Sequence, residues 1–362
     1  SSVNRYHLSV ADSRKGESIS FVRGFVNGGV YMVGSEKIFN TYIKEYMFQP
    51  NDRLFNSEKS KYIKGFQVIN ESSIYAIVKV PKANFIPGSF YVTKNYCAVG
   101  NIDVAGKVHE VMFNIAKYWF EGESDLSEKL HNDFGTIEKF IEAGMSRYTH
   151  KQFSNVSNQD KFMHLAEVDV EQSSIKNLYI KCPIATALNN GNKVYADIPI
   201  YQMIQKFDME CIDEVEIFYI GKSTASTFSR LQKHEKWGPI LSSEGDDNKY
   251  DFLAYFFVID EAAIYRGNLG GVNLIYRDFS ELPKGAITSL CEASLINYFK
   301  PEFNIEFTSS DLNNSKLFSK WLRKNGYTSV ITEVELDGVL GKLSTKERPY
   351  QVRHVCDIEI NP

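Results

Sequence analysis

The middle of the sequence carries side chains that could hold an oxyanion and move a proton beside it. Tyr219 begins a Tyr-Ile-Gly triplet, and Arg230 follows it by eleven residues. His234 comes four residues after Arg230, and side chains four apart on a helix are stacked neighbours. A guanidinium grips an anionic oxygen through its planar fork of donors, whereas a phenol or an imidazole can transfer a proton. The spacing therefore predicts Arg230 and His234 on one helix face, after the strand that ends in Tyr219.

A second group lies further along the chain. Glu292 is the one acidic residue between Ile287 and Lys300, within a stripe of apolar residues at helical spacing. Asn304 follows it by twelve residues, at the end of the segment Lys300-Pro-Glu-Phe-Asn304. Mg²⁺ takes few carboxylates together with phosphate oxygens and water. Glu292 is therefore a candidate ligand for one divalent ion, Mg²⁺ or Mn²⁺, in each site.

Each of these residues also has an ordinary structural interpretation. A strand tyrosine can face the core with its hydroxyl hydrogen-bonded, a loop lysine can be solvated, a helix-surface histidine can be structural, and a helix glutamate can be exposed. Tyr219 is the strand tyrosine, Lys222 the loop lysine, His234 the helix-surface histidine and Glu292 the helix glutamate. The order and spacing of the whole set carry more information than any single position.

Taken in order, these features resemble the GIY-YIG nuclease superfamily. In that family a Tyr-Ile/Val-Gly strand end is followed by a helical Arg, sometimes with a His one turn later, then by a helical Glu and a Lys/Arg-Pro-x-[Phe/Tyr]-Asn segment. The resemblance covers residues 190–310 of the 362. It implies a small three-stranded antiparallel sheet flanked by helices, and endonucleolytic hydrolysis of phosphodiester bonds.

The resemblance also implies roles for the individual residues. Arg230 would clamp the scissile phosphate, and Glu292 would bind the metal ion. His234 would assist proton transfer or bind phosphate, and Asn304 would fix the site by hydrogen bonds. Lys222 would favour the phenolate form of the general base through its positive charge.

The first motif of the family is where this sequence departs. A Gly-Ile-Tyr strand normally lies much closer to the Tyr-Ile-Gly than the best candidate here, Pro199-Ile-Tyr201, which is eighteen residues ahead of Tyr219 and lacks the glycine. A longer hairpin loop over residues 206–213 could absorb the difference, and Val194-Tyr195 is a second candidate. Either Tyr219 or Tyr201 would be the general base.

Local patterns predict the elements that hold these groups. Residues 214–220 alternate as a strand does, and residues 252–259 are apolar on both faces, which is typical of a central strand. Ser226 or Thr227 can cap a short helix that runs to about Trp237. The apolar stripe from Ile287 to Phe299 predicts a helix that Pro301 stops.

The length predicts two domains or one domain with large additions, and the mixture of strand and helix patterns predicts an α+β protein. The expected parts are an N-terminal α+β domain at residues 1–160, with a role in target recognition or regulation, the nuclease module at 161–310, and a C-terminal extension at 311–362. A polar stretch at 150–160 suggests the first boundary, and a basic amphipathic helix at 315–324 marks the extension.

Charge, cysteines and hydropathy narrow the class of protein. A formal net charge of −4 disfavours coating of nucleic acid by bulk electrostatics, so any grip must come from local basic patches, which could equally be solvated faces. The candidates are Lys59, Lys61 and Lys64, and Lys316, Lys320, Arg323 and Lys324. Five widely spaced cysteines predict buried free thiols rather than disulfides or a zinc site. No apolar run is long enough to cross a bilayer and no leader is recognised, so we expect a cytoplasmic protein without a membrane partner.

The first functional hypothesis is a DNA endonuclease of a restriction or anti-phage defence kind, acting on double-stranded DNA. Because one metal per site usually cuts one strand, a homodimer on the substrate is expected. The second is a nuclease-derived nucleic-acid-binding or regulatory protein whose altered first motif has cost it catalysis. The third keeps the chemistry and makes RNA the substrate.

Overall fold

The computed structural model describes residues 8–11, 18–21, 33–120, 125–146, 155–181, 190–191, 195–243, 249–269, 272–278, 284–304 and 316–360. The protein is a mixed α+β structure, which confirms the predicted class. It divides into two compact units: unit 1 comprises residues 1–80, 214–247 and 251–362, and unit 2 comprises residues 81–213 and 248–250. Unit 2 is thus inserted into unit 1.

This division differs from the predicted boundaries near residues 160 and 310. The residues expected to form a C-terminal extension are part of unit 1, as are residues 33–80. The physical reason is that strands far apart in the sequence pair with each other, and the composition along the chain does not show which strands will pair. β15 (Ser329–Glu335) pairs in parallel with β3 (Val33–Pro50), so the two ends of the chain share one sheet.

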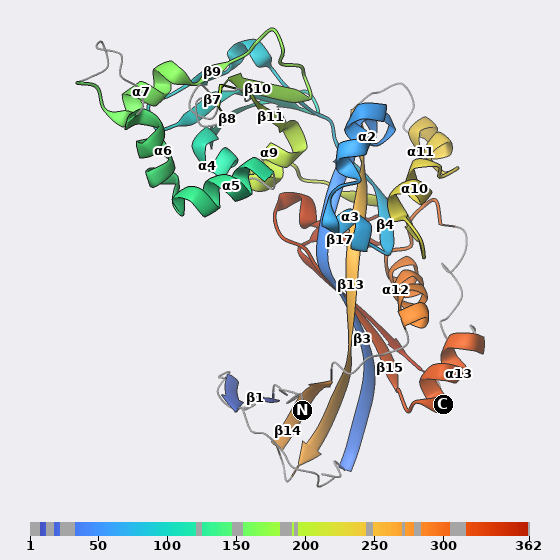
Figure 1. The fold of residues 1–362 in the computed structure, drawn as a ribbon. Coiled ribbons are helices and arrows are strands. Elements are labelled where there is room, and N and C mark those ends of the chain that lie inside the picture. Colours follow the sequence, from blue (N-terminus) through green and yellow to red (C-terminus); the bar gives the residue numbers. More distant parts are fainter. Residues whose placement is uncertain are drawn as a thin grey trace. The chain divides into compact units, whose positions relative to one another are not determined.

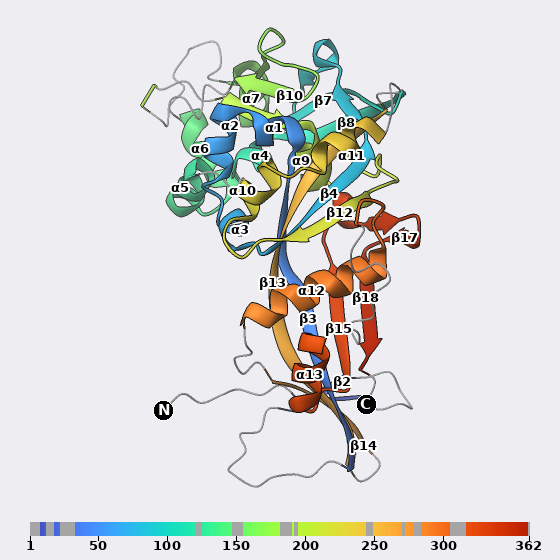
Figure 2. The ribbon, with the colours of Figure 1, turned by 90° about the vertical axis from the view of Figure 1, so that its right-hand side faces the viewer.

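The sheet of unit 1 is built around one long antiparallel pair. β3 pairs with β13 (Tyr250–Leu269) from Pro50 opposite Leu253 to Val33 opposite Asn268. β15 runs beside β3 (Figure 1), and β18 (Arg353–Glu359) pairs with the other edge of β15 (Figure 2). Residues 252–257 of β13 are buried on both faces, which confirms the predicted central strand.

The other half of this sheet carries the residues singled out from the sequence. In order across the sheet, β13 is followed by three further strands. These are β4 (Ile74–Pro81), β12 (Glu216–Lys222) and β16 (Leu343–Thr345). β4 and β12 run antiparallel, whereas β12 and β16 run parallel. The strands predicted at residues 214–220 and 252–259 therefore lie in one large sheet with β4 between them, and strands from both ends of the chain extend this sheet.

Short helices cover the β4 and β12 half of unit 1. They are α1 (Asn51–Phe55), α2 (Ser57–Ile63), α3 (Gln67–Glu71), α10 (Thr227–Gln232) and α11 (Trp237–Ser243). Leu54, Ile69, Phe228 and Trp237 from these helices pack with Tyr75 in one buried cluster. The Ser226 hydroxyl accepts a hydrogen bond from the Ser229 N–H, as predicted for the N-cap.

Two longer helices cover the other end. α12 (Lys284–Phe299) packs against β12, β15 and β18, and α13 (Lys316–Lys324) follows it in the chain (Figure 2). Ile287 and Leu290 of α12 and Leu322 of α13 share a buried cluster with Phe39 of β3. Lys320, Arg323 and Lys324 are exposed, as expected for the outer face of a docked amphipathic helix.

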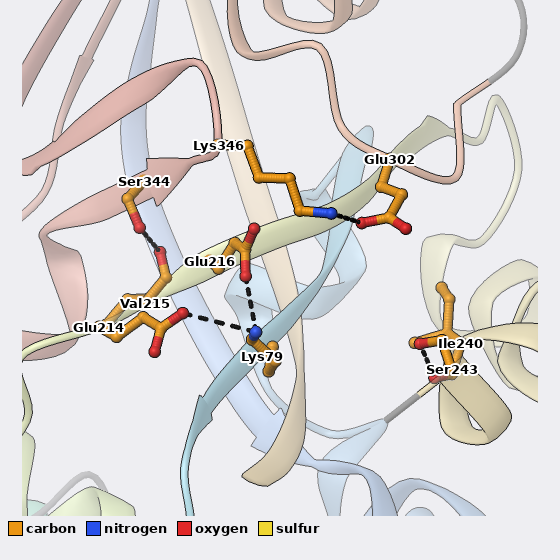
Figure 3. A network of polar contacts seen from close by, with 9 residues as sticks. All are labelled: Lys79, Glu214, Val215, Glu216, Ile240, Ser243, Glu302, Ser344 and Lys346. Carbon is orange, nitrogen blue, oxygen red and sulfur yellow. Dashed lines mark hydrogen bonds and ion pairs between the residues drawn. The ribbon is translucent and has the colours of Figure 1, made fainter. Parts of the chain in front are cut away.

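A buried ion pair joins β4 to β12 close to the residues at which unit 2 begins and ends in the sequence. Lys79 and Glu216 are opposite each other in β4 and β12, with Lys79 Nζ 2.7 Å from Glu216 Oε2 and 3.4 Å from Glu214 Oε1 (Figure 3). The Ser344 hydroxyl donates to the Val215 carbonyl at 3.0 Å. The two strands are therefore tied together on the unit 1 side of the insertion.

Unit 2 contains two small sheets and several helices. One sheet has β7 (Cys97–Val104) paired with β5 (Ala83–Phe85), β6 (Tyr91–Val92) and β8 (Lys107–Asn114). The other has the order β11 (Tyr195–Pro199), β10 (Asn177–Lys181) and β9 (Glu167–Val168). The helices are α4 (Ile115–Phe120), α5 (Asp125–Phe134), α6 (Ile137–Ser146), α7 (Asn158–Leu165) and α9 (Ile200–Lys206).

The cysteines in the described part of the chain are free thiols, as predicted. Cys97, Cys291 and Cys356 are buried and Cys211 is half-buried, while Cys182 lies outside the described residues.

Candidate active site

Two tyrosines meet where β4 and β12 pair. Gly221 lies opposite Tyr75 in the register, and Tyr219 lies opposite Ile77 after a bulge at Phe218. A Cβ atom at Gly221 would lie 2.6 Å from Tyr75 Cζ and 2.9 Å from Tyr219 Cε1. Both rings therefore lie directly against Gly221, and any side chain at that position would displace them.

His234 joins these two rings. Its ring centroid is 4.6 Å from that of Tyr219 and 5.9 Å from that of Tyr75, and the two tyrosine rings are 6.3 Å apart. The predicted helix to Trp237 is wrong, because α10 ends at Gln232 and α11 begins at Trp237. His234 lies in the turn between them, so it reaches the tyrosines from a turn rather than from the helix face of Arg230.

One hydrogen bond to the His234 ring identifies the tautomer of its neutral form. The Lys236 N–H donates to His234 Nδ1 at 3.2 Å, so the ring proton of the neutral form is on Nε2. Burial, and next the positive charge of Arg230, lower the pKa of His234 below its usual value. At neutral pH His234 is therefore a neutral imidazole whose Nε2 can donate a hydrogen bond.

Arg230 and Glu292 both act on the two phenols. Burial raises the pKa of Tyr75 well above its usual value, and the Arg230 guanidinium, which donates toward the Tyr75 hydroxyl, opposes this rise. Burial also raises the pKa of Tyr219, as does the negative charge of Glu292, while Arg230 and the Tyr75 hydroxyl lower it. Both phenols are thus neutral at physiological pH, and Arg230 is the main cation that favours their ionised forms.

Glu292 lies on α12 and is paired with a lysine. Its Oε2 atom is 2.8 Å from Lys222 Nζ, which also donates to the Ser289 hydroxyl at 2.9 Å. The Glu292 residue is 8% exposed. Lys222 was expected to act on a phenolate, but the structure pairs it with this carboxylate.

Glu292 is the residue of this cluster that could hold a magnesium or manganese ion. A nearly buried carboxylate that already holds one cation is placed where positive charge is stabilised. No group of three or more His, Cys, Asp or Glu side chains in the described residues could hold a metal. A single carboxylate could hold Mg²⁺ only together with substrate oxygens and water, which is a ligand set that Mg²⁺ accepts.

Asn304 fixes the strand that carries Tyr219. Its Nδ2 donates to the Ile220 carbonyl and its Oδ1 accepts from the Ile220 N–H, both at 2.8 Å. The Phe303 N–H donates to the Phe218 carbonyl at 3.0 Å. The segment after α12 thus bonds to β12 on both sides of Tyr219, and β4 holds the opposite edge. Tyr219 is positioned by both.

Tyr201, one of the two candidates for the general base, belongs to unit 2. It lies in α9 and is 1% exposed. Its hydroxyl donates to the Pro81 carbonyl and accepts from the Ala83 N–H, both at 3.0 Å. The hydroxyl therefore links α9 to the start of unit 2. The second candidate, Val194-Tyr195, lies partly outside the described residues.

Tyr75 is the residue that the sequence did not indicate. It follows Ser73-Ile74 in β4, so an Ile-Tyr pair is present, without the glycine that the family has before it. In the sequence this pair is far from Tyr219, because residues 81–213 of unit 2 separate it from β12. Its one signal in the sequence is an Ile-Tyr pair at the start of a strand-like segment.

No family model, no curated protein and no solved structure matches this chain. Among the described residues, no helix has the length and apolar character that a membrane crossing requires.

Proposed function

We propose that this protein is a metal-dependent endonuclease with a GIY-YIG-like site in unit 1. The observation that carries the proposal is the cluster formed by Tyr75, Tyr219, Arg230 and Glu292. Two strands bring the phenols together over Gly221, and the guanidinium and the carboxylate both act on them. In the family that the sequence resembles, two tyrosines, an arginine and a glutamate form the site.

The chemistry of the cluster suits phosphodiester hydrolysis. Arg230 is exposed, so its planar guanidinium can bind the oxygens of a scissile phosphate bidentately. The Nε2–H of His234 can donate to the same phosphate or to the leaving oxygen. A divalent ion bound at Glu292 would neutralise charge on the phosphate and on the leaving oxygen.

One of the two phenols would take the proton of the attacking water. Proton transfer to a phenol requires that it first be ionised, and the raised pKa of Tyr219 opposes this. Glu292 contributes to that rise through its negative charge, so a cation on the carboxylate would remove that part of the opposition. In the structure the Lys222 ammonium pairs with this carboxylate.

Double-stranded DNA is the proposed substrate, and RNA is the alternative. We assign target recognition or regulation to unit 2, in place of the N-terminal domain expected from the sequence. The reason is that unit 2 lies, in chain order, between β4 and β12, the strands that carry Tyr75 and Tyr219. A restriction or anti-phage defence role, a cytoplasmic location and a homodimer on the substrate remain part of the proposal.

One observation favours a second candidate, a nuclease-derived binding protein without catalysis. The Lys222 ammonium is paired with the Glu292 carboxylate, and an ion pair that never dissociates would prevent a metal ion from binding to this carboxylate. Such a protein would bind nucleic acid through Arg230 and leave it intact.

Supercoiled plasmid, incubated with purified protein and Mg²⁺ or Mn²⁺, separates these two functions. We expect nicking or linearisation that a chelator stops and that Glu292→Ala reduces by on the order of 10² to 10⁴. The matched control is Glu335→Ala, an exposed carboxylate of β15, which should cut at the wild-type rate.

Binding of plasmid without metal-dependent cutting by the wild-type protein would contradict the enzyme and support the binding protein. Parallel reactions with single-stranded DNA and structured RNA identify the substrate class. Faster cutting of RNA than of duplex DNA would replace the first substrate by the alternative.

A further inference from the structure

The Lys222 side chain makes two contacts with one face of α12. Its Nζ lies 2.8 Å from Glu292 Oε2 and 2.9 Å from Ser289 Oγ. Ser289 precedes Glu292 by three residues, so the hydroxyl and the carboxylate lie on the same side of the helix. The ammonium is therefore held by a small two-point site rather than by a single contact.

The pairing has an electrostatic reason. The Glu292 side chain is 10% exposed, whereas that of Lys222 is 32% exposed. A nearly buried carboxylate is costly without a counter-charge, and Lys222 supplies this charge from the more open side. The lysine can leave towards solvent, while the glutamate stays where it is.

The backbone of Lys222 is fixed while its head can move. Lys222 lies opposite Ile74 at the end of β12, and the next residue, Ser223, donates its N–H to the Ser73 carbonyl at 3.0 Å. The four-carbon stem of a lysine is flexible and carries a compact charge. Motion of the ammonium therefore does not require motion of the strand that carries Tyr219.

We propose that Glu292 exchanges cations, holding the Lys222 ammonium when no metal is bound and releasing it when a divalent ion binds. An ammonium and a divalent ion cannot share one carboxylate oxygen at short distance, because like charges repel. Metal binding then frees a positive charge next to the Tyr-Ile-Gly triplet, where it can meet a substrate phosphate. This inference rests on the proposed function for the identity of the metal site.

The exchange predicts that Lys222 weakens metal binding, although it is a residue of the site. Removal of the ammonium should tighten Mn²⁺ binding, because the ion no longer displaces a competitor. Retention of a positive charge at the same position should leave the affinity nearly unchanged. A supporting role for the lysine in metal binding would give the opposite order.

Calorimetric titration of Mn²⁺ into the full chain without nucleic acid tests this order. We expect Lys222→Met to bind Mn²⁺ roughly tenfold more tightly than wild type, Lys222→Arg to bind it as wild type does, and Lys222→Met with Glu292→Gln to lose binding. Lys233→Met, which removes an exposed lysine after α10, is the matched control. Ser289→Ala should also tighten binding, since it loosens the ammonium without removing it.

A thermal melt provides the second measurement. In chelator, Lys222→Met should melt below wild type because the Lys222 ammonium no longer pairs with the nearly buried Glu292 carboxylate, and Mn²⁺ should abolish this difference in melting temperature. Equal or weaker Mn²⁺ affinity in Lys222→Met, or no Mn²⁺ binding in any variant, would overturn the exchange. Because neither readout uses cutting, a failure of nuclease activity is recorded separately by the plasmid reaction.

Discussion

Gly221 determines how closely the two phenols of the site approach each other. The rings of Tyr75 and Tyr219 occupy the space that a side chain at this position would need. The glycine of the Tyr-Ile-Gly triplet thus has a steric role that can be stated in atoms, and it does not depend on an unusual backbone conformation.

Gly221→Ala should therefore reduce cutting while the protein stays folded. The added methyl would meet Tyr75 Cζ at 2.6 Å, so the ring must shift, and misplacement of a reacting group by about 1 Å costs on the order of 10²-fold in rate. The rate of plasmid cutting and the melting temperature measure the two effects. Gly238→Ala is the matched control because a Cβ there meets no atom within 4 Å.

A Gly221→Ala protein that cuts as fast as Gly238→Ala would show that the position of the Tyr75 ring does not matter for the reaction. Loss of folding would instead appear in the melting temperature and would leave the rate without a mechanistic meaning.

At the residue scale, the sequence identified the groups that have a strong chemical type and a short local spacing. The structure places four of them in unit 1, namely Tyr219, Arg230, Glu292 and Asn304. Arg230 and Glu292 both affect the pKa of Tyr219, and Asn304 hydrogen-bonds to the backbone of the next residue, Ile220. The contacts of Lys222 were not foreseen, because an ion pair between a strand end and a helix depends on packing. Tyr75 was missed for a related reason, since its partner is far away in the chain.

β12 is the element on which the site depends most. β4 pairs with one edge, and the other edge is shared by β16 at Glu216 and by Asn304 at Ile220. Local patterns predicted β12, the centre of β13 and α12, because each is a run of residues with a clear period. The same patterns extended α10 too far, because the turn at residues 233–236 depends on hydrogen bonds made by His234.

The ion pair between β4 and β12 leads to a prediction about stability. Side chains of Lys79 and Glu216 are 10% and 11% exposed. Lys79→Met removes the cation and leaves a buried carboxylate unpaired, so we expect the free energy of unfolding to fall by about 3 kcal/mol. Urea denaturation measures it.

Lys346→Met is the matched control for this experiment. Its ammonium pairs with Glu302 at 2.5 Å, but the Lys346 side chain is 71% exposed (Figure 3), and exposed pairs contribute at most about 1 kcal/mol. Equal losses in the two variants would mean that the Lys79 pair does not hold the two strands together.

At the scale of the whole molecule, the arrangement of the chain explains why the domain boundaries could not be read from the sequence. Residues 81–213 form the connection between two neighbouring antiparallel strands. The entropic cost of closing a loop grows only slowly with its length, so a folded unit can replace a short hairpin turn. The distance between two strands in the sequence then no longer indicates whether they are neighbours. For this reason the sequence pointed to Tyr201, which is nearer to Tyr219 along the chain than Tyr75 is.

The rate of plasmid cutting by Tyr75→Phe, compared with that by Tyr201→Phe, shows whether the active site lies where β4 pairs with β12. Both substitutions remove only a hydroxyl from a buried ring, one in each unit. We expect a loss on the order of 10²-fold or more for Tyr75→Phe and a near wild-type rate for Tyr201→Phe. Wild-type cutting by Tyr75→Phe, or a selective loss in Tyr201→Phe, would contradict an active site formed where β4 meets β12.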